Sequence, residues 1–292
     1  MPRRCDRAPT ATKVDSQRVL LGSHLDARPR AGASCAAVTR SSAATGDEAR
    51  SKVPEVTFVF WMIKVAATTL GETAGDAVSM SMNLGYLVGT AIFASVFICA
   101  VAVQIAASKF QPFVYWTTII ATTTVGTTMA DFADRSLGIG YAGGSTLLFA
   151  LLLGSLAIWF RTLGTVSVSS ISSPMAESFY WITIMFSQTL GTALGDWTAD
   201  TAGLGYAGSA VVFSLLLGLV ALLAYATRVP RTFLFWAAFI LTRPLGAVVG
   251  DFLDKPVTSS GLALSRYSAS AVLLLFIVVC ILRFKPRAAG GG

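Results

Sequence analysis

The sequence predicts an all-α membrane protein whose eight transmembrane helices form four tandem helical hairpins in parallel orientation. Its 292 residues are 54% hydrophobic and 13% charged, with a mean hydropathy of +0.68, whereas soluble domains contain about 25% charged residues. A tryptophan recurs at the same place in four similar segments, with steps of 55, 65 and 55 residues. Each segment contains two apolar stretches near the roughly 20 residues that a helix needs to cross a bilayer.

Residues 1–52 form a basic tail before the first segment. They hold ten of the 22 Lys and Arg residues and five of the 15 Asp and Glu residues, so they carry +5 of the net charge of +7. The tail has no sustained apolar period and cannot bury a core, so we expect it to be disordered. Because the rest of the chain is nearly balanced in charge, the composition argues against nucleic-acid binding. No apolar stretch in the tail marks a signal peptide.

The four segments align without gaps in a register set by the tryptophans. Ten residues after each tryptophan stands a glycine, and fifteen residues after it stands an aspartate. The tryptophans are Trp61, Trp116, Trp181 and Trp236, the glycines are Gly71, Gly126, Gly191 and Gly246, and the aspartates are Asp76, Asp131, Asp196 and Asp251. A fixed period of this kind indicates a repeat architecture.

Each repeat supplies two helices in chain order. The apolar stretches cover residues 56–78 and 84–107, 113–131 and 138–160, 179–197 and 204–226, and 232–253 and 267–284. A Gly-Tyr pair at Gly85, Gly140 and Gly205 predicts a tight turn into the second helix, with the Tyr at the membrane interface. The fourth copy keeps only Gly261 there.

Two crossings per repeat return the chain to the same side, so the copies form a parallel array about the membrane normal and not an inverted repeat. The longer middle step comes from a Ser-rich connector, residues 165–173, so the array is either pseudo-four-fold or two halves of four helices. The predicted parts are the tail (1–52), repeat 1 (53–110), repeat 2 (111–164), connector and repeat 3 (165–228), repeat 4 (229–286) and a C-terminal tail (287–292).

The charges of the connections predict the topology. The even connections and the C-terminus carry Lys109, Arg161, Arg228, Arg231, Arg283, Lys285 and Arg287. The odd connections carry the four repeat aspartates together with Asp134, Asp200 and Asp254, and their basic residues are Arg135, Lys255 and Arg266. The positive-inside rule therefore places both termini in the cytoplasm and the aspartates toward the outside.

Small residues follow the first helix of every repeat. The glycine at position ten is followed four residues later by Gly75, Ala130, Gly195 or Gly250. Such a ridge allows two helix backbones to approach closely in lipid. We therefore expect the four first helices to pack together at the centre, with the second helices facing lipid.

A polar stripe in steps of four also follows each first helix, and residues four apart lie on one helix face. The stripe contains Lys64, Thr68, Glu72 and Asp76 in repeat 1, Thr123, Thr127 and Asp131 in repeat 2, Gln188, Thr192 and Asp196 in repeat 3, and Arg243 and Asp251 in repeat 4. Ionisable groups inside apolar helices are costly. We expect Lys64, Glu72 and Arg243 to face inward and to be paired.

A purely structural interpretation competes with a functional one. The four aspartates could cap the next element, and Lys64 with Glu72 could form an internal charge pair that holds helices together. Each repeat tryptophan is expected to be an interfacial anchor or a packing residue and not a ligand contact.

The Trp–Gly–Asp register, repeated four times over about residues 54–286, resembles a bacterial family of uncharacterised membrane-anchored proteins. Its members consist of four tandem copies of a repeat of unknown function, each with two transmembrane segments and a characteristic Trp. The resemblance implies a multi-pass protein of the bacterial inner membrane. It implies no activity, cofactor or catalytic residue.

Function is therefore predicted from the stripe. A ring of carboxylates attracts cations, so the first hypothesis is a permease or channel for a cation with an acidic extracytoplasmic mouth. Carboxylate and hydroxyl ligands would suit a hard divalent metal ion, although Lys64 and Arg243 leave an anionic or amphoteric solute open. The second hypothesis is a structural or regulatory membrane module that transports nothing. His24 is the single histidine and the four cysteines are scattered, so an enzyme or a bound cofactor is not expected.

Overall fold

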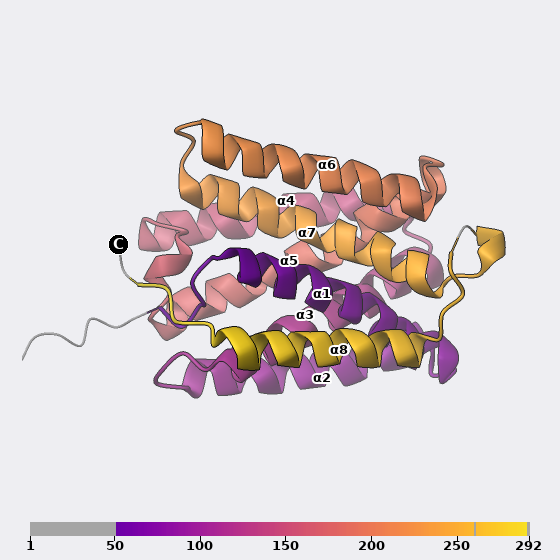
Figure 1. The fold of residues 1–292 in the computed structure, drawn as a ribbon, viewed down its shortest axis with the longest axis horizontal. Coiled ribbons are helices and arrows are strands. Elements are labelled where there is room, and N and C mark those ends of the chain that lie inside the picture. Colours follow the sequence, from indigo (N-terminus) through magenta and orange to yellow (C-terminus); the bar gives the residue numbers. More distant parts are fainter. Residues whose placement is uncertain (1–50, 260, 291–292) are drawn as a thin grey trace, which may run out of the picture. The chain divides into compact units, whose positions relative to one another are not determined.

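The computed structural model of the protein describes residues 51–259 and 261–290. These residues form eight long α-helices, which agree with the predicted helical segments apart from shifts of a few residues at their ends. The helices are α1 (Phe58–Asp76), α2 (Gly85–Ala106), α3 (Pro112–Asp131), α4 (Tyr141–Leu163), α5 (Pro174–Asp196), α6 (Gly205–Ala226), α7 (Arg231–Asp254) and α8 (Arg266–Phe284). Figure 1 shows them running side by side along one bundle.

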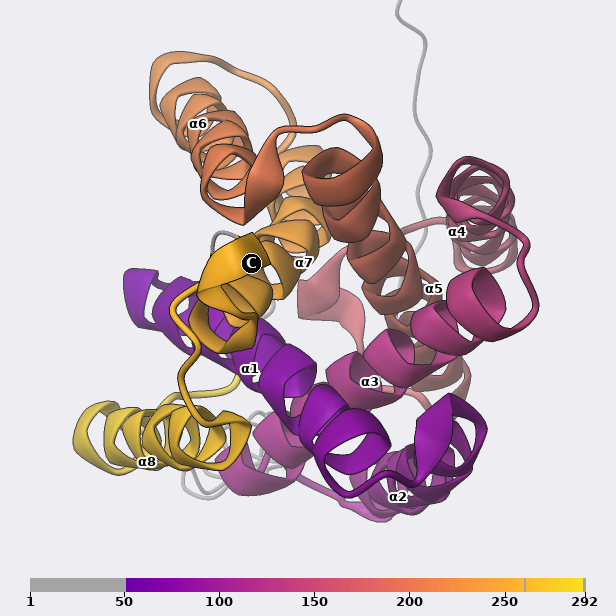
Figure 2. The same cartoon turned by 90° about the vertical axis from the view of Figure 1, so that its right-hand side faces the viewer.

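The first helices of the four repeats form the centre of the bundle. Helix α1 packs against α3, α3 against α5, α5 against α7, and α7 against α1, which closes a ring. Figure 2 looks along the bundle and shows the remaining helices, α2, α4, α6 and α8, at the corners outside that ring. The prediction that the first helices lie inside is confirmed.

The two helices of one repeat do not form a tightly packed hairpin, contrary to the expected arrangement. Helix α2 packs mainly on α3, α4 on α5, and α6 on α7, so each outer helix covers the inner helix of the following repeat. Helix α8 packs on α1 and completes the circle. Each repeat therefore buries the apolar face of its neighbour, as repeat units that have no core of their own must do.

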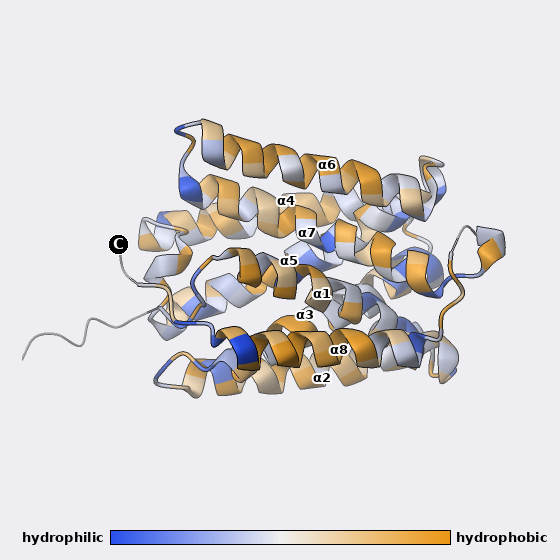
Figure 3. Ribbon diagram, viewed as in Figure 1, coloured by the Kyte–Doolittle hydropathy of each residue, from blue (hydrophilic) through white to orange (hydrophobic). Residues whose placement is uncertain are grey.

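The outer surface is apolar, as a bilayer requires. Helices α2, α4, α6, α7 and α8 are long and apolar enough to cross a membrane, and all of these except α7 are largely exposed along their length. Figure 3 shows the hydrophobic colouring along the outer helices and polar residues near the bundle ends. An apolar surface of this extent marks a membrane protein. The inner helices α1, α3 and α5 are more polar, but they belong to the ring and are covered by the outer helices.

Short irregular segments follow the inner helices. A π-helical turn comes directly after the terminal aspartate of α1, α3 and α5, at Ala77–Ser81, Phe132–Ser136 and Trp197–Thr201. The chain then turns at Gly85, Gly140 and Gly205, whose φ angles of 77°, 78° and 63° are in the region that favours glycine. The predicted tight turn before each of these second helices is confirmed.

The predicted glycine ridge forms the contacts of the inner ring. The glycine at position ten of each repeat faces the residue at position seven of the next repeat around the ring. The contacts join Gly71 with Thr123, Gly126 with Gln188, Gly191 with Arg243, and Gly246 with Thr68. The second glycines behave alike: Gly75 faces Thr127, Gly195 faces Ala247, and Gly250 faces Glu72. A Cβ atom at Gly250 would lie 2.6 Å from that of Glu72, so only glycine permits this approach.

The repeat tryptophans close the ring at the opposite end from the aspartates. Each one contacts the aromatic residue that precedes the tryptophan of the previous repeat. The ring centroids are 5.4 Å apart for Phe60 and Trp116, 5.8 Å for Tyr115 and Trp181, 6.2 Å for Tyr180 and Trp236, and 5.8 Å for Phe235 and Trp61. Trp116, Trp181 and Trp236 are buried. The tryptophans therefore act in packing between repeats.

The bundle includes two residues that the sequence placed in the tail. Ser51 donates a hydrogen bond to the carbonyl of Val168 (2.6 Å), and the Lys52 ammonium pairs with Glu177 (2.6 Å). The next residues pair with the C-terminal segment through an antiparallel bridge between Pro54 and Ala288. Ser51 and Lys52 therefore contact the bundle, because Lys52 pairs with a carboxylate at its end. The rest of the predicted disordered tail, residues 1–50, lies outside the described residues.

Candidate functional site

The polar stripe lies on the inner surface of the ring, and its residues form layers along the ring axis. We number positions from the tryptophan of each repeat. Position 7 holds Thr68, Thr123, Gln188 and Arg243, position 11 holds Glu72, Thr127, Thr192 and Ala247, and position 15 holds Asp76, Asp131, Asp196 and Asp251. All of these residues are buried. Because one turn separates successive layers, the stripe runs along the axis of the bundle.

Arg243 occupies the centre of the position-11 layer. Its Nη2 donates hydrogen bonds to Glu72 Oε2 (3.0 Å) and to the hydroxyls of Thr127 (2.6 Å) and Thr192. These partners come from α1, α3 and α5. The fourth residue of the layer is Ala247, on the same helix as Arg243, and its small side chain leaves space for the guanidinium. The guanidinium therefore joins all four inner helices and closes the axis at this level.

Thr68 and Gln188 complete position 7 with different roles. The Thr68 hydroxyl bonds the carbonyl of Thr242 (3.1 Å), so this residue ties α1 to α7. Both polar atoms of the Gln188 side chain are buried and lack a hydrogen-bond partner among the described residues. Contacts with the described part of the protein therefore do not explain why a polar side chain is buried at Gln188.

Lys64 stands one turn further toward the tryptophans, at position 3. The other repeats place Ile119, Ile184 and Phe239 there, so the layer is otherwise apolar. The Lys64 ammonium lies 4.2 Å from the centroid of the Phe239 ring and has no hydrogen-bond partner within the described part of the chain. The expectation that Lys64 would be paired is wrong, because Glu72 turns to Arg243 instead.

Two basic residues hold the four aspartates together. Arg135 Nε lies 3.0 Å from Asp131 Oδ1, and its Nη2 lies 3.5 Å from Asp196 Oδ2. Lys255 Nζ lies 3.0 Å from Asp251 Oδ1 and 2.6 Å from Asp76 Oδ2. Each cation thus bridges the aspartate of its own repeat and that of the next repeat. The aspartates are no more than 2% exposed, so they form a closed, bridged layer and not an open ring of free carboxylates.

The repeat register of the sequence contains a signal for these bridges that the charges of the connections do not reveal by themselves. Arg135 and Lys255 both stand at position 19, in the second and fourth repeats, where the other repeats have Met80 and Asp200. Burial disfavours the charged form of Lys255, but Asp251 and Asp76 raise its pKa above its usual value. A second pair, Arg266 Nε with Asp254 Oδ2 at 2.8 Å, adjoins this end of the bundle.

The carboxylates lie close enough together to hold a metal ion. Glu72, Asp76 and Asp131 can each offer one oxygen such that the three lie within 4.8 Å of one another, and so can Asp76, Asp251 and Asp254. Asp76 belongs to both groups, and its Oδ1 is buried without a hydrogen-bond partner in the described structure. Oxygen-only ligand sets suit hard cations such as Mg²⁺. We name the carboxylates of positions 11 and 15, with Asp254, the acidic cluster.

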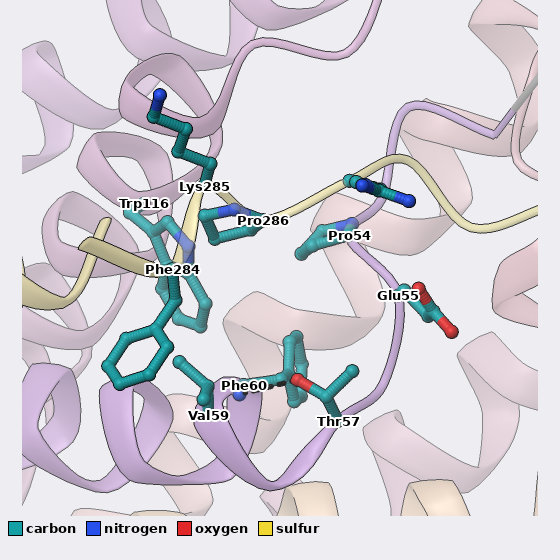
Figure 4. Close-up of a pocket in the computed structure, with 10 residues that line it drawn as sticks. Pro54, Glu55, Thr57, Val59, Phe60, Trp116, Phe284, Lys285 and Pro286 are labelled. Carbon is teal, nitrogen blue, oxygen red and sulfur yellow. Dashed lines mark hydrogen bonds between the residues drawn. The ribbon is translucent and has the colours of Figure 1, made fainter. Parts of the chain in front are cut away.

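A surface pocket of about 360 Å³ lies at the other end of the bundle (Figure 4). Its lining comes from the beginning of α1, from Trp116, and from the end of α8 and the segment after it, and includes Phe60, Phe284 and Lys285. Trp116 and Asp131 are separated by fifteen residues of α3, or roughly 22 Å at 1.5 Å per residue. The pocket is therefore separate from the acidic cluster.

Fold and site together define a helical membrane protein built from four tandem repeats, with a buried charge network along its central axis. The family model described as Repeat of Unknown Function (DUF347) matches residues 59–110, 114–165, 179–229 and 234–285, which is more than half of the chain, and the protein belongs to that family. The resemblance expected from the tryptophan register is confirmed. No curated protein and no solved structure matches the chain.

Proposed function

We propose that the protein is a permease for a small cation, with a pathway along the axis of the inner ring. In this proposal all eight helices cross the bacterial inner membrane, both termini are cytoplasmic and the aspartate layer faces the outside. The described state is occluded, since aromatic residues close one end of the axis and Arg135 and Lys255 close the other.

The observation that carries the proposal is the charge of the axis. Five buried carboxylates, those of Glu72 and the four repeat aspartates, are joined by ion pairs to three cations, Arg243, Arg135 and Lys255. With every group ionised, two negative charges remain in this ion-paired network, and the Asp254–Arg266 pair does not change that balance. Lys64 lies deeper on the axis and pairs with none of these carboxylates, and its ammonium would leave one negative charge over the whole axis. A surplus of buried carboxylate favours binding of a cation, because an uncompensated charge in a low-dielectric interior is costly. A divalent ion would supply the missing charge.

The geometry of the ligands supports the same class of solute. Two groups of three carboxylates in the acidic cluster each offer oxygen atoms within 4.8 Å of one another, with Asp76 common to both groups. Arg135 and Lys255 occupy the place of a cation in the occluded state, and an entering metal ion would take over their carboxylates. Exchange between resident ammonium or guanidinium groups and a metal ion would open the outer end.

A structural module without transport is the second candidate. It is favoured by Arg243, whose guanidinium holds side chains from three other helices and fills the axis at its level. In that case the ion pairs serve only to hold the ring together. The two candidates differ in one observable, the movement of cations across a membrane.

Purified protein in liposomes tests the proposal, with a dye sensitive to divalent ions inside one set of liposomes and dyes sensitive to monovalent ions inside a parallel set. We expect uptake of Mn²⁺ or Mg²⁺ above that of empty liposomes, and strong loss of uptake with Asp76→Asn. Asp200→Asn is the matched control, since Asp200 lies at the same end but is exposed. No uptake of any mono- or divalent cation by folded wild-type protein would establish the structural module instead.

A further inference from the structure

A second group of buried polar atoms lies deeper than the acidic cluster and takes no part in the proposed cation site. It consists of Lys64 Nζ, Thr123 Oγ1, both polar atoms of Gln188, and Nε and Nη1 of Arg243, none of which has a hydrogen-bond partner in the described residues. All four side chains are 0% exposed. Buried polar groups without partners are rare in native proteins and indicate a bound ion or water.

These atoms belong to one region of the axis. Thr123, Gln188 and Arg243 share position 7, where each faces the glycine of the neighbouring inner helix. Lys64 lies against Phe239, which precedes Arg243 by one turn of α7. The region is bounded by the aromatic layer on one side and by the Glu72–Arg243 pair on the other.

With Lys64 protonated, the region carries a positive charge. Glu72 binds Nη2 of Arg243 and so balances that guanidinium, while Nε and Nη1 of Arg243 point elsewhere without partners. The described structure contains no carboxylate paired with Lys64. A charged ammonium within a membrane-embedded ring requires a counter-charge, and Glu72 on the same helix is already paired with Arg243.

The available hydrogen-bonding groups are mainly donors. An ammonium has three N–H donors and no acceptor, the free guanidinium nitrogens of Arg243 are donors only, and the Gln188 amide and Thr123 hydroxyl add more. Water could satisfy some of these groups but would leave the charge of Lys64 unbalanced. An anion satisfies both the donors and the charge.

We propose that Lys64, Thr123, Gln188 and Arg243 form a buried site for a small inorganic anion of halide or nitrate size. The anion lies on the axis between the aromatic layer and the Glu72–Arg243 pair. It would also explain how a cation pathway can contain Lys64, because a resident anion screens the repulsion between this ammonium and a passing cation. Anion binding does not require that any cation moves, so the two proposals can fail separately.

The test is direct binding of bromide and nitrate to the purified full-length protein in detergent. Thermal unfolding and calorimetric titration are followed with sodium bromide or sodium nitrate, against sodium gluconate at equal ionic strength. We expect a saturable rise in the melting temperature and a saturable heat with bromide and nitrate, and neither with the bulky gluconate anion. A response that grows without saturation, or is equal for gluconate, overturns the site.

Variants locate the binding within the chain. Lys64→Met should weaken bromide binding by at least about tenfold, since it removes a charge-assisted contact. Lys285→Met is the matched control, because Lys285 is exposed beyond the end of α8, and its affinity should equal that of the wild type. Gln188→Leu changes no charge and should also weaken bromide binding. It provides an independent measurement of affinity if Lys64→Met does not fold. Wild-type affinity in folded Lys64→Met or Gln188→Leu protein would exclude this location.

Discussion

Arg135 and Lys255 stand at the same position of the second and fourth repeats, and each bridges two aspartates from neighbouring inner helices. Because Met80 and Asp200 take this position in the first and third repeats, a basic residue recurs in every second copy while the backbone repeats in every copy. The ring of four inner helices is therefore joined by two ion-pair bridges, each of which links two aspartates. The closed ring of inner helices matches the pseudo-four-fold arrangement that the sequence left open. The bridges do not mark two separate halves of four helices, because they join repeat 2 to repeat 3 and repeat 4 to repeat 1.

The first prediction concerns Lys255. Lys255→Met should leave Asp76 and Asp251 without their shared cation, and breaking a buried pair from one side costs about 3–5 kcal/mol. The melting temperature should fall, and Mg²⁺ or Mn²⁺ should restore much of the loss by binding the freed carboxylates.

The measurement is thermal unfolding of the purified protein with and without divalent cations. Lys109→Met is the control, because Lys109 is exposed at the other end of α2, and its melting temperature should match the wild type. If divalent cations fail to stabilise Lys255→Met, the acidic cluster does not bind them in the way proposed.

The second prediction concerns the glycine ridge. Gly191→Ala should destabilise the bundle, because the new Cβ would collide with Cβ and Cγ of Arg243. Gly218→Ala is the matched control, since a Cβ there meets open space on α6. Replacing glycine by alanine in a free helix position should stabilise it by roughly 0.5–1 kcal/mol.

Opposite shifts of the melting temperature for these two alanine variants check the second prediction. A larger contrast is expected between Gly191→Leu, which should prevent assembly, and Leu at the exposed Ser214 on α6. Equal tolerance of Leu at both places would contradict the close packing of α5 and α7.

Much of the fold could be predicted from the sequence because four copies carry the same information. The gapless register of Trp116, Gly126 and Asp131 with their counterparts fixed the eight helices and the inner position of the first ones. Which outer helix covers which inner helix was not predictable, since the outer helices are apolar all round and fit any neighbour equally well. Only tertiary packing placed α8 on α1.

The stripe was predicted as a set of positions but not as a set of contacts. Glu72 could meet Lys64 in its own helix or Arg243 in another, and helical periodicity cannot decide between them. The structure decides for Arg243, because Gly191 on α5 allows its stem to cross toward the axis and Ala247 leaves space for the guanidinium. Arg135 and Lys255 contribute to the topology prediction only as loop charges, although their shared position in the repeat is visible in the sequence.

The third prediction concerns topology and follows from the charge difference between connections. A reporter inserted after Arg228 should read as cytoplasmic, and one inserted after Ser259 should read as extracytoplasmic. Cysteine labelling from outside intact cells at the same two places provides an independent measurement. The reverse pattern would invert the whole bundle and place the acidic cluster toward the cytoplasm.

The fourth prediction compares two carboxylates at different depths. Asp196→Asn should reduce cation uptake while the protein stays folded, since Asp196 is one of four aspartates and lies 3.5 Å from Arg135. Glu72→Gln should reduce uptake more severely, because it removes the single carboxylate that balances Arg243 and one ligand of the acidic cluster. Asp200→Asn, an exposed change at the same end, should leave uptake unchanged.

Stability separates transport from folding in this comparison. Glu72→Gln leaves a buried guanidinium without its counter-charge, so its melting temperature should fall, whereas removal of both charges in Glu72→Gln with Arg243→Gln should recover part of that loss. Uptake should remain low in the double variant, because the acidic cluster still lacks a ligand. If folded Asp196→Asn and Glu72→Gln proteins both transport cations at the wild-type rate, these carboxylates take no part in transport and their charges serve only to hold the four inner helices together.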